Sequence, residues 1–290
     1  MSKGGGGLCI RFWGTRGSLP APGRDTSLFG GNTSCIEVRA GNQLIILDCG
    51  SGMRLLGNEL VGTSPLEAHV LLTHYHWDHI MGLPFFAPLF MDGNTIHLYG
   101  ETKQGMDVRE VLSGQMIKPY FPVSMGIECQ AEMPAHAVAP GDEFDIAGVR
   151  ASCCRLNHPG DALGFRLDYG NRSVVYATDI EHGTKSDSHL EKLARDADVL
   201  IYDATYTEAE YEKLKGWGHS TWRAGVTLAR SAGVKHLVLF HHLPERTDQQ
   251  VAALEREAKR EFEDVTAARE GMTLELPEGG RVRVLPDSEG

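Results

Sequence analysis

Potential metal ligands crowd into six consecutive residues directly behind a strand-like apolar run. Residues 70–72 read Val-Leu-Leu, as in a buried strand. Residues 74–79 read His-Tyr-His-Trp-Asp-His, in which five side chains can bind a metal ion or contact one of its ligands. Zinc and neighbouring first-row divalent ions favour imidazole nitrogen and carboxylate oxygen as ligands. The alternative is a polar surface turn that is rich in histidine. Because Asp78 and His79 add to the His-x-His pair, the pattern favours a metal-binding loop at the end of a buried strand.

The length of 290 residues allows one large domain or two small ones, and 41% hydrophobic residues suffice for a sizeable core. No Pro/Ser-rich linker, charge block or repeat divides the chain. We therefore predict a single domain over residues 1–290. Its ends at residues 1–7, which contain four consecutive glycines, and 286–290 are predicted to be flexible.

The formal net charge of −11 argues against a broad basic surface that would follow a nucleic-acid backbone. It does not exclude a small anionic substrate, because bound cations reverse the local field. The chain has neither an apolar leader nor a stretch of about 18 apolar residues, so we expect no secretory signal and no membrane contact. Six cysteines without Cys-x-x-Cys pairing favour reduced thiols in a cytoplasmic protein over a disulfide framework.

Strand-like and helical patterns alternate along the chain. Helical spacing predicts one helix over 220–232, stopped by Gly233, and another over about 248–269. A closing hairpin is expected to pair 272–276 with 281–285. Further strands are predicted at 9–13, 34–39, 43–48, 68–73, 95–99, 150–156, 164–169, 173–178, 199–203 and 236–240. This mixture indicates an α/β architecture in which helices cover the sheets.

Four later residues share the placement of the histidine-rich segment, because each closes a predicted strand or follows it. They are His158, Asp179, Asp203 and His241. A single histidine after a strand is more often a surface residue or a satisfied core residue. Their shared position at strand ends is what predicts that they meet at one site.

With these residues in place, the chain resembles the metallo-β-lactamase fold superfamily. His74-x-His76-x-Asp78-His79 matches the signature of that superfamily, and the resemblance runs from residues 30–34 (Gly-Gly-Asn-Thr-Ser) and 47–52 (Leu-Asp-Cys-Gly-Ser-Gly) to the closing hairpin. It implies an αββα four-layer sandwich. It also implies two divalent metal ions, which would be zinc, manganese or iron. Two such ions would let a shared water lose a proton near neutral pH.

The resemblance also implies a ligand for each coordination position. One ion is expected on His74, His76 and His158 and the second on Asp78, His79 and His241, with Asp179 bridging them. His242 is an alternative to His241, although His241 directly follows the apolar strand. Asp48 and Asn32 are candidates for supporting the ligands, and both could equally fasten turns.

Two further segments are similar to the tRNA 3′-processing nucleases and related phosphodiesterases. Residues 156–166 contain a Leu-x-His stretch followed by Gly-Phe-Arg, and Tyr202-Asp203-Ala204-Thr205 precedes His219-Ser220-Thr221, although the relatives have His-Glu at positions 202–203. His219 oriented by Asp203 could protonate a leaving oxygen, and we count both, with Asp78, as catalytic. The alternative is that His219 only precedes the helix beginning near residue 220.

The tRNA-processing enzymes carry a long arm between the third histidine ligand and the bridging aspartate, and residues 159–178 leave no room for one. We therefore expect a dinuclear phosphodiesterase that hydrolyses a small cyclic nucleotide or related phosphodiester by a metal-bridging hydroxide, and no nucleic-acid partner. The alternatives are a tRNase Z-like RNA endonuclease and a non-catalytic nucleotide-binding protein. Residues 83–126, rich in Phe, Tyr and Met, could cover the site, form a homodimer contact or be ordinary core.

Overall fold

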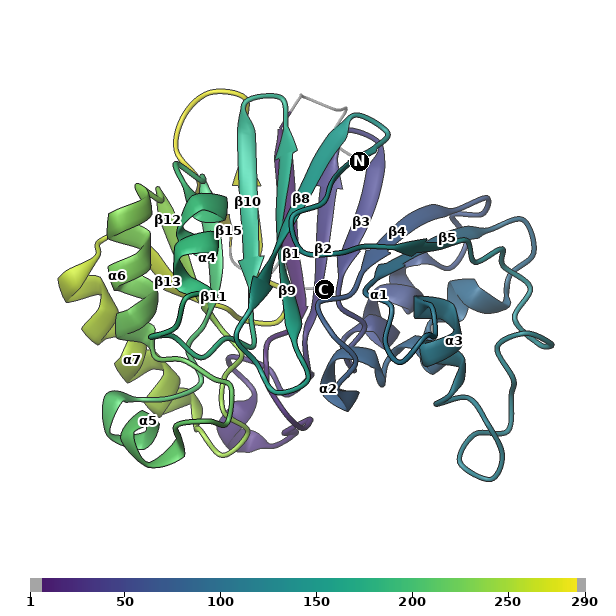
Figure 1. The fold of residues 1–290 in the computed structure, drawn as a ribbon, viewed down its shortest axis with the longest axis horizontal. Helices are drawn as coiled ribbons and strands as arrows, with labels where there is room; N and C mark the ends of the chain where they lie inside the picture. Colours follow the sequence, from purple (N-terminus) through teal and green to yellow (C-terminus); the bar gives the residue numbers. More distant parts are fainter. Residues whose placement is uncertain (1–6, 286–290) are drawn as a thin grey trace.

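Two mixed β-sheets form the centre of the molecule in the computed structural model, which describes residues 7–285 (Figure 1). Apart from Gly7, the ends that the sequence predicts to be flexible lie outside the described residues. The eight-stranded sheet has the order β15-β14-β1-β2-β3-β4-β5-β6. Its strands are β1 Leu8–Gly14, β2 Cys35–Ala40, β3 Gln43–Leu47, β4 Glu67–Leu71, β5 Thr95–Gly100, β6 Ala135–Ala137, β14 Thr273–Leu276 and β15 Arg283–Leu285.

The second sheet has seven strands in the order β13-β12-β11-β10-β9-β8-β7. These strands are β7 Glu143–Ile146, β8 Val149–Leu156, β9 Ala162–Tyr169, β10 Arg172–Ala177, β11 Val199–Asp203, β12 His236–Phe240 and β13 Val265–Ala267. The helices are α1 Met53–Leu60, α2 Trp77–Ile80, α3 Val108–Ser113, α4 Asp187–Ala194, α5 Glu208–Leu214, α6 Trp222–Ala232 and α7 Asp248–Glu261, with short 3₁₀ turns at Arg24–Thr26, Leu83–Phe85 and Ala87–Phe90.

Apolar side chains fill the space between the two sheets and the space outside each. The central cluster joins residues of both sheets, such as Phe12 of β1 and Phe240 of β12, whose ring centroids lie 6.1 Å apart. A second cluster packs α4, α6 and α7 on β10–β12, and a third packs α1 and α3 on β3–β5. Figure 1 shows these two groups of helices on opposite outer sides of the strands. The predicted αββα sandwich is therefore confirmed.

The predicted strands and the helix over 220–232 are found with small shifts of their ends, whereas α1–α5, β6 and β7 were not predicted. The helix predicted over about 248–269 ends at Glu261, and residues 265–267 form β13, which pairs in parallel with β12. The helical spacing of Phe262 and Val265 was misleading, because the free edge of β12 recruits the segment as a strand, so tertiary pairing overrides local periodicity. The closing hairpin is confirmed, with Thr273 opposite Leu285.

The parallel strands bring the candidate residues to one edge of the sandwich. β3, β4 and β5 run parallel in the first sheet, and β10, β11 and β12 run parallel in the second. Asp48 and the 74–79 segment follow the ends of β3 and β4, while Asp179, Asp203 and His241 stand at the ends of β10, β11 and β12. Carboxyl ends of parallel strands are the usual location of binding sites in α/β folds.

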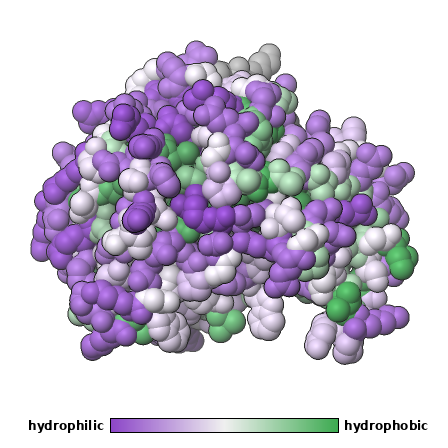
Figure 2. Space-filling view, in the orientation of Figure 1, coloured by the Kyte–Doolittle hydropathy of each residue, from purple (hydrophilic) through white to green (hydrophobic). Residues whose placement is uncertain are grey.

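Residues 83–126 combine core and surface. Phe86 is fully buried against α1, whereas Phe85 and Tyr120 are exposed, and the rings of Phe85 and Phe121 meet edge to face at 5.5 Å. A role of this segment in covering the site or in a homodimer remains a prediction. The face in Figure 2 is largely hydrophilic, with apolar residues in small separate groups. Among residues 7–285 there is no helix with the length and apolar character needed to cross a membrane.

Candidate metal centre and active site

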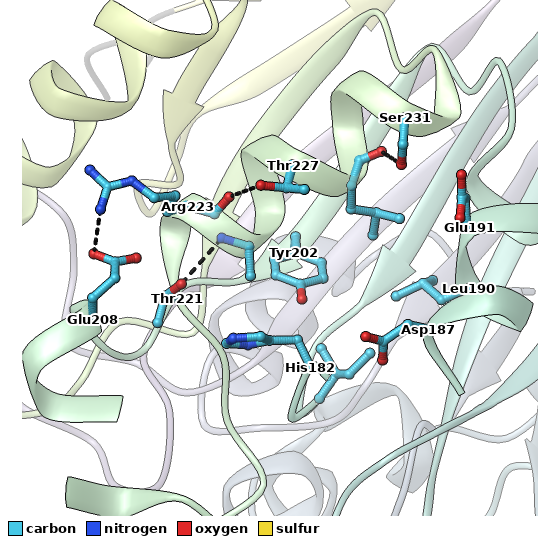
Figure 3. A pocket seen from close by; sticks show the side chains of 13 residues that line it. His182, Asp187, Leu190, Glu191, Tyr202, Glu208, Thr221, Arg223, Thr227 and Ser231 are labelled. Carbon is cyan, nitrogen blue, oxygen red and sulfur yellow. Dashed lines mark hydrogen bonds and ion pairs between the residues drawn. The ribbon is translucent and has the colours of Figure 1, made fainter. Parts of the chain in front are cut away.

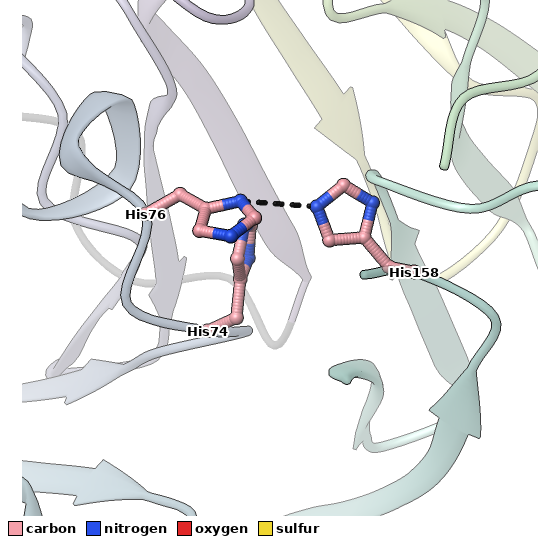
Figure 4. Close-up of side chains that lie close together, drawn as sticks. All are labelled: His74, His76 and His158. Atoms are coloured by element: carbon pink, nitrogen blue, oxygen red, sulfur yellow. Dashed lines mark hydrogen bonds between the residues drawn. The ribbon is translucent and has the colours of Figure 1, made fainter. Parts of the chain in front are cut away.

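Three histidines, His74, His76 and His158, form the first group of candidate metal ligands (Figure 4). His74 and His76 come from the loop after β4, and His158 comes from the loop after β8. One ring nitrogen of each lies within 4.8 Å of the others, and His158 Nε2 stands 3.1 Å from His76 Nδ1. His74 and His158 are buried, so this group forms the inner part of the site and His76 its more exposed side.

A second group of four buried side chains lies beside the first and comprises Asp78, His79, Asp179 and His241. Asp179 Oδ2 is 3.1 Å from His79 Nε2 and 3.2 Å from His241 Nε2. Its other oxygen, Oδ1, lies 3.7 Å from His158 Nε2 and 3.9 Å from His74 Nε2. One carboxylate therefore faces both groups, as a bridging ligand must.

Buried hydrogen bonds fix the rings that follow β4. Thr73 donates its hydroxyl to Asp48 Oδ2 at 2.9 Å and accepts from His74 Nδ1 at 3.0 Å. His79 Nδ1 donates to the same carboxylate at 2.8 Å, and the Tyr176 hydroxyl adds a bond of 2.9 Å. Because each Nδ1 is a donor to its neighbour, Nε2 of both rings faces the site. Asp48 thus orients candidate ligands instead of only fastening a turn.

The rings of His158 and His241 have partners in loops beside the second sheet. His158 Nδ1 donates to the Gly218 carbonyl at 2.8 Å. Thr205 donates its hydroxyl to the His241 carbonyl at 2.8 Å and accepts from His241 Nδ1 at 3.0 Å. His242, the sequence alternative to His241, points elsewhere and donates to the Ala268 carbonyl at 2.9 Å. The structure therefore places His241, and not His242, among the candidate ligands.

The donor set fits a divalent cation. His74 Nε2 is buried without a hydrogen-bond partner among the described residues, and its nearest carboxylate oxygen stands at 3.9 Å. A buried polar atom without a partner costs about 1–3 kcal/mol, so convergence of such an atom with carboxylates and imidazoles favours a bound ion. Imidazole and carboxylate atoms are the ligand types of zinc and similar divalent metals.

Burial and neighbouring charges together lower the pKa values of Asp179 and His74 and raise the pKa of His79. Burial would raise the pKa of Asp179, but the imidazoles of His241 and His79 outweigh it and hold that pKa well below its ordinary value. Burial, together with His79, lowers the pKa of His74 well below its ordinary value. Burial also opposes the charge on His79, yet Asp78 and Asp179 raise its pKa well above the ordinary value. The carboxylates are consequently ionised and able to ligate.

Three residues at strand ends adopt a left-handed backbone. The φ angles are 59° at Asp48, 56° at Asp179 and 61° at His241. Such conformations cost on the order of 1–3 kcal/mol at residues other than glycine and cluster at functional sites. They turn the chain sharply after β3, β10 and β12, which directs these side chains toward one point instead of continuing the strand alternation.

Asp203 and His219 form a pair beside the second group. His219 Nδ1 lies 2.9 Å from Asp203 Oδ2 and 3.9 Å from Asp179 Oδ1. Burial would lower the pKa of His219, but the Asp203 carboxylate and its hydrogen bond raise it to about 9. Asp203 therefore favours the protonated form of His219. Thr221 caps α6 with its side chain, so His219 has no capping role.

Several residues of the site escaped the sequence analysis. A Cβ on Gly17 would stand 2.1 Å from the His241 ring, and the backbone N–H of Ser18 donates to Asp78 Oδ2 at 2.7 Å. A short side chain and an exposed turn are weak signals, so only the site geometry identifies them. Asn32, a suggested support, instead donates to Glu270 at 3.0 Å and accepts from Ser51, and so fastens loops away from the ligands.

A pocket of about 400 Å³ opens the candidate ligands to solvent. Its lining is Ser18, Tyr75, His76, Trp77, Asp78, Asp179 and His219. A separate pocket of about 410 Å³ lies behind the His219–Asp203 pair, where Figure 3 shows His182, Tyr202 and Arg223 around it. Its lining contains none of the candidate ligands, whereas His76, Asp78, Asp179 and the adjoining His219 line the first pocket.

Comparisons with known proteins identify relatives over nearly the whole chain. Residues 44–242 match the family model described as a beta-lactamase superfamily domain. Ribonuclease Z of Myxococcus xanthus is 27% identical over 322 aligned residues, which cover 93% of this chain and 98% of the relative. Among solved structures, the metallo-beta-lactamase fold protein YhfI from Bacillus subtilis has a TM-score of 0.72 at 21% identity, covering 93% of this chain and 99% of that one. Human tRNase Z, short form, has a TM-score of 0.68 at 23% identity, covering 93% and 99%.

Proposed function

Because the chain belongs to the beta-lactamase superfamily domain family, and because its candidate metal-ligating groups adjoin a histidine with a raised pKa, we propose that it is a metal-dependent ribonuclease of the ribonuclease Z type. It hydrolyses an RNA phosphodiester bond. The observation that carries this proposal is the Asp203–His219 pair, which stands 3.9 Å from the carboxylate shared by both ligand groups. A proton donor at that position serves a reaction whose leaving group is an alkoxide.

The expectation of a small phosphodiester substrate and no nucleic-acid partner is wrong. The relatives that span 93% and 92% of the chain are ribonucleases Z. Net charge misled because it sums over the whole surface, whereas phosphate contacts depend on the local field. At this site, bound cations would dominate that field. The short β9–β10 hairpin between His158 and Asp179 means that RNA contacts come from other segments.

Each part of the site has a task in the proposed reaction. His74, His76 and His158 would hold one divalent ion and Asp78, His79 and His241 a second, with Asp179 between them. When bound, two such ions lower the pKa of water and neutralise charge on the phosphate. Asp203 holds His219 through the 2.9 Å contact at Nδ1, which leaves Nε2–H of the protonated ring free to protonate the departing ribose oxygen. Thr73, Asp48 and Thr205 keep the ligand rings in place.

Trp77 supports RNA as the substrate. Its side chain is 79% exposed although it lines the pocket between the ligands His76 and Asp78. In the free protein the apolar ring of an exposed tryptophan faces water. It gains an apolar contact when a nucleobase stacks on its face. The Trp77 position beside the reactive phosphate suits a base next to the cleaved bond. Recognition by stacking tolerates any base, so it fits single-stranded RNA near a cleavage site.

Replacing Trp77 by alanine is expected to weaken the binding of RNA substrates selectively. Loss of one base–aromatic contact of about 1–3 kcal/mol raises KM for RNA by about 5- to 150-fold. KM for bis(p-nitrophenyl) phosphate, which has no base, should change little. Steady-state kinetics on both substrates measure the effect, with Tyr120→Ala as a matched control because Tyr120 is 83% exposed and does not line the pocket. An equal loss on both substrates would assign Trp77 to the ligand loop instead.

A substrate panel tests the proposed function itself. Metal-loaded protein is incubated with a precursor tRNA, an unstructured RNA, cyclic mononucleotides, a lactone and a β-lactam. We expect cleavage of RNA with a 3′-hydroxyl product, abolished by a chelator and restored by Zn²⁺ or Mn²⁺. Turnover of cyclic nucleotides with no cleavage of either RNA would reject the proposal, as would hydrolysis of the β-lactam or lactone alone.

A further inference from the structure

A second histidine cluster stands on β4 and β5, apart from the ligands of the active site. His69 and His97 are partners in the parallel register of the two strands, and their rings stack at 4.7 Å with an interplanar angle of 8°. Glu67 precedes His69 by two residues on β4 and therefore projects from the same face. One possible ligand atom from each of the three residues lies within 4.8 Å of the others.

Neighbouring side chains contact Nδ1 of both the His69 and the His97 ring. His69 Nδ1 lies 3.3 Å from the Tyr99 hydroxyl, and His97 Nδ1 lies 3.0 Å from His136 Nε2. This directs Nε2 of each ring away from those partners, and His97 Nε2 stands 3.3 Å from Glu67 Oε1. A ligand histidine is typically oriented in this way, with one nitrogen bonded to a neighbour and the other free. His79 and His241 show the same arrangement in the active site.

His69 also carries an orphaned atom. The residue is 5% exposed, and its Nε2 has no hydrogen-bond partner among the described residues. Burial, with His97 as the next contribution, lowers the pKa of His69 to about 4. The ring is therefore neutral at physiological pH, and in the tautomer whose Nδ1–H donates to Tyr99, Nε2 carries the lone pair. A buried nitrogen in this state is unsatisfied unless a cation or a water reaches it.

We propose that Glu67, His69 and His97 bind one divalent transition-metal ion of the zinc class. Two imidazoles and one carboxylate form a ligand set suited to zinc, whereas calcium and magnesium prefer sites made of oxygen alone. Glu67 is exposed and His97 partly so, which gives the ion a route from solvent and leaves room for a water ligand. The ion joins β4 to β5, so its role is to fasten two strands rather than to react with substrate.

Metal counting in a background with a weakened active site tests this cluster. Asp179→Ala protein, which lacks the ligand shared by the two active-site groups, is saturated with Zn²⁺, dialysed and analysed for bound metal. We expect the bound metal to fall by one equivalent when His97→Ala or Glu67→Gln is added, whatever the three-histidine group His74, His76 and His158 retains. Both residues are partly or largely exposed, so these variants are expected to fold. His189→Ala is the matched control, since His189 is exposed elsewhere and should leave the equivalent in place.

Spectroscopy gives a second readout on the otherwise native protein. Co²⁺ substitution should produce visible absorption bands from three sites, and His97→Ala should remove the share of one while phosphodiesterase activity is unchanged. Equal metal content of the His97→Ala, His189→Ala and parent proteins would overturn the proposal. It would also be overturned if His97→Ala lost activity in step with metal, because the ion would then belong to the active site.

Discussion

Replacing Asp179 by alanine is expected to abolish hydrolysis. Asp179 Oδ2 lies 3.1 Å from His79 and 3.2 Å from His241, and its Oδ1 faces His158 at 3.7 Å, so its loss deprives both ligand groups of their shared anion. Asp78 would remain as the only carboxylate of the second group, and the first group would keep imidazoles alone. Loss of metal-assisted catalysis removes several kcal/mol of transition-state stabilisation, which corresponds to at least about a thousandfold lower kcat/KM.

Elemental analysis and steady-state kinetics measure this variant together, and circular dichroism checks that it folds. Asp168→Ala is the control, because Asp168 lies on β9 and pairs with Arg166 away from the ligands. The control should keep both the metal content and the activity of the parent. An Asp179→Ala protein with the full metal content and undiminished turnover would contradict the assignment of Asp179 as the bridging ligand.

Replacing His219 by alanine should lower turnover without releasing metal. A positioned general acid contributes about 10²- to 10⁴-fold to the rate, and the proton on His219 is held there by Asp203 at 2.9 Å. The decrease in turnover should be large for RNA, because its ribose alkoxide is a poor leaving group. It should be small for bis(p-nitrophenyl) phosphate, because p-nitrophenolate departs without a proton. Kinetics on both substrates reveal the difference.

Asp203→Asn separates positioning from proton donation. Asparagine still meets His219 but no longer stabilises its charged form, so an intermediate loss on RNA is expected. The metal content of both variants must match the parent, which elemental analysis verifies. If His219→Ala slowed both substrates equally, His219 would instead act on the ligand groups, consistent with its 3.9 Å approach to Asp179.

The sequence predicted most of the sandwich because each sheet is built from short apolar runs that turn residues separate. It also predicted which residues meet, since His158, Asp179 and His241 all occupy strand ends and parallel strands end at one edge. The end of α7 was missed, because the spacing of Phe262 and Val265 fits a helix and only the open edge of β12 makes the segment a strand.

The supporting contacts of the site were largely invisible in the sequence. Thr73 and Thr205 orient His74 and His241 through hydroxyls whose role depends on distances of about 3 Å across the fold. Gly17 matters only because the His241 ring occupies the space of its missing side chain. The substrate class was misjudged because total charge describes the solvent-averaged surface, whereas RNA binding depends on a few local groups.

The pairing of β1 with β14 sets the order in which the first sheet can assemble. Leu8 lies opposite Leu276, so β1 must wait for a strand that is made much later in synthesis. Contacts so distant in sequence slow folding, because a long loop must close before they form. Until then one edge of β1 stays open to pairing with other chains. Recovery from denaturant should therefore depend on protein concentration, and dilute refolding should give the higher yield.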